Sequence, residues 1–163
     1  MPTRTLSATF IEPGPDDANR LRVEARTESG FDLRFDSRPA AAGGIGPGPT
    51  ESILATLAAC TAMDVASILR KKRQEVASYR IEVIAQKREA HPQVFTAITV
   101  EHQVTGAVTA EALRRSIELS ATAYCPVSAM LSGSVPIDHR YRLQRDGADA
   151  EVGLAAHTGP PAG

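Results

Sequence analysis

The feature that most constrains the fold is one long apolar stretch that follows a loop rich in glycine and proline. Residues 40–49 read Ala-Ala-Ala-Gly-Gly-Ile-Gly-Pro-Gly-Pro, a composition that excludes regular structure. Pro49 in a first helical turn, and Glu51 near the positive end of the helix, predict a helix from residue 49 to about residue 73. Apolar side chains cover most of its circumference, so we expect a central helix that is buried on several sides.

The same stretch does not predict a membrane span, because Thr56, Thr61, Asp64 and Ser67 interrupt it. The first residues lack the apolar segment of a secretory signal. A formal net charge of -1 gives no support for a nucleic-acid partner or an acidic membrane surface. We therefore expect a cytoplasmic protein with no nucleic-acid and no membrane partner.

Segments of alternating polarity flank the helix and predict strands. The predicted strands are residues 4–11, 21–26, 31–35, 79–85, 94–104 and 137–143. A second helix is expected to begin after Thr109 as its N-cap. The order β-β-β-α-β-β-α-β indicates an α+β fold with helices packed on antiparallel sheets. We predict a single domain over residues 1–145 and, because periodicity ends there, a flexible C-terminal tail over residues 146–163.

The chain contains two cysteines, Cys60 inside the apolar helix and Cys125 directly before Pro126. In a reducing cytosol such residues are more often core thiols or redox centres than structural disulfides. Proline favours the first helical position, so Cys125 is predicted to cap a short helix whose N–H groups stabilise a thiolate. Cys60 lies in mid-helix, where burial, and Asp64 if it lies on the same face, oppose ionisation. Simple core packing remains an alternative for both thiols.

A thiolate at Cys60 needs a cation from elsewhere in the fold. The N-terminal segment offers several arginines, among them Arg20 and Arg22, and Glu51 is a candidate to hold one of them through a bidentate salt bridge. The histidines and cysteines show no metal-ligand spacing, and no nucleotide-binding glycine motif is found. We therefore predict no metal site and no bound cofactor.

Three segments resemble the signatures of one known family. Residues 46–65 resemble the first signature of the OsmC/Ohr family, the osmotically inducible and organic hydroperoxide resistance proteins. Residues 91–96 and 124–128 are similar to its later signatures, in the same order. The resemblance extends from about residue 20 to residue 143. The run Cys-Thr-Ala-Met-Asp-Val with a basic helix end looks most like the YhfA-type branch.

The resemblance implies an OsmC-like fold, an intertwined homodimer with each active site at the subunit interface, and thiol-dependent reduction of organic hydroperoxides. By this similarity Cys60 attacks the peroxide and Cys125 resolves its sulfenic acid into a disulfide. An external dithiol, such as a lipoyl group or dithiothreitol, then resets the enzyme. Glu51 and either Arg22 or Arg20 are the supporting residues that the resemblance suggests.

The chain departs from the peroxidase pattern at one position. Peroxidase members commonly carry a glutamate ten residues before the first cysteine, where this chain has Thr50, with Glu51 one place later. A shift of one residue turns a helical side chain by about 100°. This departure leaves open a noncatalytic ligand-binding or redox-sensing protein that retains the fold and the cysteine pair. A dimeric scaffold with two inert core thiols is the third possibility.

Overall fold

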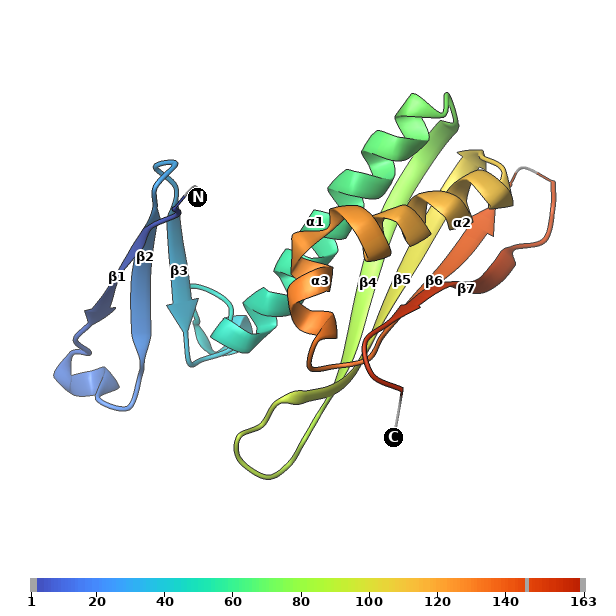
Figure 1. Cartoon of the computed structure of the whole chain (residues 1–163). Coiled ribbons are helices and arrows are strands. Elements are labelled where there is room, and N and C mark those ends of the chain that lie inside the picture. The colour runs from blue at the N-terminus through green and yellow to red at the C-terminus, as the bar shows by residue number, and fades with distance from the viewer. Residues whose placement is uncertain (1–2, 146, 162–163) are drawn as a thin grey trace. The chain divides into compact units, whose positions relative to one another are not determined.

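The computed structural model describes residues 3–145 and 147–161 (Figure 1). The chain divides into two compact units, Met1–Ile53 and Leu54–Gly163, each of which is described by itself. The first unit holds an antiparallel sheet in the order β1-β2-β3. These strands are Leu6–Ile11, Arg22–Thr27 and Asp32–Asp36, with short 3-10 turns at Pro15–Asp17 and Ala40–Ala42. The three strands predicted from alternation are confirmed, each to within two residues at its ends.

The interior of the first unit contains little apolar surface. Among its described residues, those that are buried are Arg20, Ala25 and Asp36. Leu6 is 56% exposed and Phe31 is 71% exposed. An ion pair and a small side chain therefore occupy the positions that a larger domain fills with aliphatic residues.

The second unit holds a mixed sheet in the order β4-β5-β6-β7. Its strands are Glu75–Lys87, Phe95–Ala107, Ile137–Gln144 and Glu151–Thr158. β5 and β6 are parallel, whereas the other two pairs are antiparallel. The prediction of wholly antiparallel sheets is wrong for this pair, because the helical segment between β5 and β6 returns the chain to the same end of the sheet.

Strand β7 corrects the prediction of a flexible tail over residues 146–163 for the part that the structure describes, while residues 146, 162 and 163 lie outside the described residues. It pairs with β6 along its whole length, with Leu143 opposite Glu151 and Ile137 opposite Thr158. The sequence concealed this edge strand because glycine and alanine interrupt its alternation. Gly153 has a packing reason, since a Cβ there would lie 2.9 Å from the ring of Tyr141.

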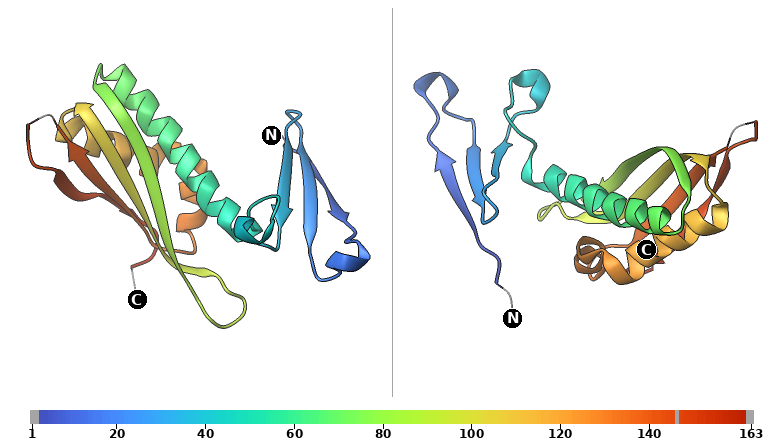
Figure 2. Two further views of the ribbon diagram at one scale, coloured as in Figure 1. Left: turned by 180° about the vertical axis from the view of Figure 1, so that it is seen from behind. Right: turned by 90° about the horizontal axis from the view of Figure 1, so that it is seen from above.

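Helices cover one face of this sheet (Figure 2). They are α1, Pro49–Lys71; α2, Ala110–Leu119, which a π-helical turn, Ser120–Tyr124, extends; and α3, Pro126–Ser132. Thr109 caps α2 as predicted, its side chain accepting a hydrogen bond from the backbone N–H of Ala112.

Helix α1 is buried along a single stripe. Leu57, Thr61, Val65 and Leu69, spaced by four residues, are buried, whereas Met63 is 74% exposed. The prediction of burial on several sides is therefore not met within the second unit, where the buried residues of α1 that the structure describes lie on one face. By length and composition α1 would also suit a membrane span, but its buried stripe is that of a core helix.

The core of the second unit consists of two apolar clusters separated by polar side chains. One cluster includes Val65, Val104 and Leu143, and the other includes Leu57, Ile98, Val100 and Ile137. Where α1, β5 and β6 cross from one cluster to the other, each contributes a fully buried polar residue. These residues are Thr61, His102 and His139. The two cysteines lie beside this polar layer.

Candidate functional site

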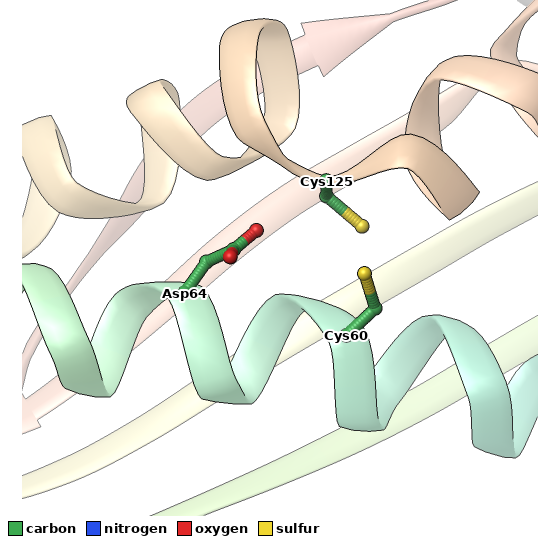
Figure 3. A group of neighbouring side chains, drawn as sticks. All are labelled: Cys60, Asp64 and Cys125. Atoms are coloured by element: carbon green, nitrogen blue, oxygen red, sulfur yellow. The ribbon is translucent and has the colours of Figure 1, made fainter. Parts of the chain in front are cut away.

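Cys60 and Cys125 come together where α1 faces the start of α3 (Figure 3). The two sulfur atoms and one carboxylate oxygen of Asp64 all lie within 4.8 Å of one another. Asp64 follows Cys60 by four residues on α1, so both side chains share one face of the helix. Both thiols are free; Cys125 is buried and Cys60 is half-buried. Two residues distant in sequence thus form one cluster with a third acidic group.

Cys125 has the helix-capping position that Pro126 predicted. Its sulfur accepts a hydrogen bond from the backbone N–H of Ser128 at 3.3 Å, inside the first turn of α3. The hydroxyl of Thr61, on α1, donates to the same sulfur at 3.7 Å. Two donors therefore hold the Cys125 sulfur at the N-cap of α3.

The surroundings of Cys60 raise the pKa of its thiol. Burial raises the pKa of the Cys60 thiol to about 11, and the neighbouring Cys125 and Asp64 act in the same direction. A backbone hydrogen bond from Val127 lowers this pKa, but less than burial raises it. The surroundings of Cys60 in a single chain therefore favour the protonated thiol, as its mid-helix position indicated.

Asp64 connects the cysteines to the polar layer. Its Oδ2 accepts a hydrogen bond from the hydroxyl of Ser120 at 3.0 Å. Burial, and secondarily the charge of Asp64, raise the pKa of the Tyr79 hydroxyl, which lies 2.7 Å from Nδ1 of His102. Within residues 3–145 and 147–161, no ion pair involves Asp64.

The sequence analysis did not predict that two histidines of this layer, His102 and His139, are buried. Burial lowers the pKa of His102 to about 3 and that of His139 to about 4, so both are neutral at neutral pH. Their ring centroids are 5.8 Å apart. Neither ring nitrogen of His139 has a partner among the residues that the structure describes. The alternation of the two strands could have predicted their burial, because each histidine lies two residues from a buried residue on the same face of its strand.

The predicted supporting residues have their contacts within the first unit. Arg20 donates to both carboxylate oxygens of Asp36 and also pairs with Asp17. Arg22 pairs with Asp17 at 2.6 Å. Glu51 accepts a hydrogen bond from the backbone N–H of Gly48, at the start of α1. The sequence suggested that Glu51 holds one of these arginines. In the structure Arg20 pairs with Asp36 instead.

Comparisons with known proteins agree with this architecture. The model of the OsmC-like protein family matches residues 42–140. Protein YhfA of Escherichia coli strain K12 is 36% identical over 124 residues, which cover 76% of this chain and 90% of that protein. The crystal structure of an OsmC-like protein from Mycoplasma pneumoniae is similar with a TM-score of 0.71 and 17% identity, covering 87% of this chain and 97% of that one.

A further similar structure is that of a protein named for resistance to organic hydroperoxides. The organic hydroperoxide resistance protein OhrB of Bacillus subtilis is similar with a TM-score of 0.56 and 20% identity, covering 87% of this chain and 98% of OhrB. At this identity, as for the Mycoplasma protein, the likeness shows a common fold.

Proposed function

Because this chain belongs to the OsmC-like protein family, we propose that it is a thiol-dependent peroxidase that reduces organic hydroperoxides to alcohols. The observation that carries the proposal is the proximity of the Cys60 and Cys125 sulfur atoms, which lie within 4.8 Å of each other. The name of the structurally similar OhrB supports the same class of substrate. Cys60 is the more exposed of the two residues, since it is half-buried whereas Cys125 is buried, which suits Cys60 to the attacking role.

The proposed reaction uses the two thiols in sequence. The Cys60 thiolate attacks the distal peroxide oxygen, the O–O bond breaks, and the alkoxide takes up a proton and leaves as alcohol. The Cys125 thiolate then attacks the Cys60 sulfenic acid and expels hydroxide, which is protonated to water, leaving a disulfide. An external dithiol supplies two electrons and two protons to restore both thiols.

The environment of Cys60 favours a second candidate. The raised pKa of Cys60 and the presence of Thr50, where peroxidases commonly carry glutamate, favour a noncatalytic ligand-binding or redox-sensing protein. Such a protein would be oxidised once and then persist as the disulfide. Multiple turnovers with excess dithiol distinguish the enzyme from the sensor.

We further propose that the chain forms a homodimer in the cytoplasm and that the partner completes the site. Large apolar side chains are exposed on both units, among them Phe10, Phe31, Met63 and Leu154. A second copy that covers them would remove this surface from water. Light scattering coupled to size exclusion tests the dimer; a monomer at micromolar concentration would reject it.

The peroxidase proposal is tested by consumption of cumene hydroperoxide under excess dihydrolipoamide. We expect repeated turnover by the wild type, its loss in Cys60→Ser, and slower turnover in Cys125→Ser, whose Cys60 sulfenic acid only the external dithiol can reduce. Absence of turnover in the wild type would reject the enzyme for this substrate. A single stoichiometric oxidation would favour the sensor.

A further inference from the structure

We propose that Cys60, Asp64 and Cys125 in the reduced protein form a binding site for a thiophilic divalent cation of the Zn²⁺ type. The sequence analysis predicted no metal site, because these ligands follow neither a C-x-x-C nor an H-x-x-x-H spacing. The site combines a Cys-x-x-x-Asp pair on one face of α1 with the N-cap of α3 (Figure 3).

The separations of the three ligand atoms suit such an ion. Two sulfur ligands at about 2.3 Å from a tetrahedral Zn²⁺ lie roughly 3.8 Å apart. The sulfur atoms of Cys60 and Cys125 and the Asp64 oxygen already lie within 4.8 Å of one another. Side-chain rotations that move these atoms by about 1 Å are therefore enough to close the coordination sphere.

Two of the three ligands are also held by neighbouring donors. Ser120 donates to Oδ2 of Asp64, which leaves the other carboxylate oxygen for a cation. Thr61 and the backbone N–H of Ser128 donate to the sulfur of Cys125. Such outer contacts orient ligands before the metal arrives, and they commonly raise affinity by 10- to 100-fold.

The donor set selects the class of cation. Two sulfurs favour a borderline or soft ion over Mg²⁺ or Ca²⁺, which take oxygen ligands. Three protein ligands leave a fourth position for water, as in open rather than closed zinc sites. Binding requires both thiolates, so uptake of the ion releases the thiol protons to solvent. Formation of the Cys60–Cys125 disulfide removes both sulfur ligands and therefore excludes the cation.

The test is a titration of the reduced, full-length protein with Co²⁺ in the absence of oxygen, followed by displacement with Zn²⁺. We expect thiolate-to-cobalt charge-transfer bands and the visible bands of four-coordinate cobalt, saturating at one ion per chain. Asp64→Asn keeps the size and the Ser120 contact but removes the charge, and should weaken binding by about tenfold or more. The exposed Glu111→Gln on α2 is the matched control and should bind as the wild type.

Absence of charge-transfer bands in the wild type would overturn the proposal, as would unchanged Co²⁺ affinity in a folded Asp64→Asn variant. If that variant does not fold, Ser120→Ala, which removes only the outer contact, should weaken binding by about tenfold, and unchanged affinity there would contradict the site. Oxidation of the wild type with diamide should abolish the bands. Hydroperoxide turnover is not measured in this experiment, so failure of the metal site leaves the peroxidase proposal intact.

Discussion

Each compact unit contains a cluster of ionisable side chains, and the two clusters differ in how their charge is compensated. In the first unit, the buried Asp36 pairs with the buried Arg20 and accepts two backbone hydrogen bonds. In the second, Cys60, Asp64 and Cys125 face one another, and the donors that the structure describes for them are hydroxyl and amide groups. The first cluster thus contains an ion pair that stabilises its unit, whereas the second has no ion pair among the residues that the structure describes.

The largest expected effect on stability comes from breaking the buried ion pair of Arg20 and Asp36. Arg20 holds the pKa of Asp36 well below its usual range, so the pair stabilises the protein above the ordinary carboxyl pKa and loses this effect as the pH falls. Asp36→Asn removes the charge opposite a buried guanidinium and should lower the melting temperature more than any other single acid-to-amide change. Thermal unfolding followed by circular dichroism measures it.

The exposed pair of Arg26 and Asp32 provides the control for this variant. Asp32→Asn should stay within about 1 kcal/mol of the wild type, because solvent already screens that pair. Equal melting temperatures for Asp36→Asn and Asp32→Asn would show that the buried cluster does not hold the first unit together.

A second prediction concerns the two neutral histidines of the polar layer. Their folded pKa values lie below the ordinary 6.5, so the unfolded chain binds more protons and stability is lost as the pH falls below about 6.5. At about pH 5 each histidine should cost about 2 kcal/mol relative to neutral pH. Urea denaturation at both pH values measures this loss.

His139→Leu is the matched variant, because neither ring nitrogen of His139 has a described partner. Removal of both nitrogens costs no hydrogen bond, so the variant should unfold near the wild-type urea concentration at neutral pH and resist acid better. The same pH dependence in variant and wild type would contradict a buried neutral histidine at this position.

The sequence predicted the parts of this molecule that local rules determine. The capping role of Cys125 followed from Pro126, and the central helix from Pro49 and the apolar run after it; both are confirmed. Strand β7 could not be predicted in the same way, because an edge strand with one neighbour needs little alternation.

Other features depend on contacts between distant residues. The helix spacing places Asp64 beside Cys60, but only the tertiary fold brings Cys125 to both. The pairing of Arg20 with Asp36, rather than with Glu51, likewise depends on how β2 and β3 are arranged. Sequence spacing alone does not contain this information.

A third prediction follows from the raised pKa of the Cys60 thiol. A pKa of about 11, against an ordinary value of 9.0, makes the thiolate fraction at neutral pH about a hundredfold smaller. Alkylation of Cys60 by iodoacetamide, followed by peptide mass spectrometry, should be slow at pH 7 and accelerate by about tenfold per pH unit up to pH 9. A rate that is independent of pH in this range would indicate that a cation, such as a partner's arginine, already activates the thiol.

The smallest expected effect is that of Asp64 on the rate at which iodoacetamide alkylates Cys60. Its charge is the least of the causes that raise the pKa of Cys60. Asp64→Asn should therefore accelerate alkylation of Cys60 at pH 7 by only a few-fold, with Glu111→Gln as the unchanged control. Slower alkylation in Asp64→Asn would identify Asp64 as a base that helps to remove the thiol proton.

The most direct test of the cysteine pair is to treat the reduced protein with one equivalent of cumene hydroperoxide and map its disulfides by mass spectrometry of non-reduced peptides. We predict one intramolecular Cys60–Cys125 disulfide per chain, with one equivalent of cumyl alcohol formed. Two thiols that remain reduced, or sulfinic acid at Cys60 without a disulfide, would contradict a redox pair formed by these two residues.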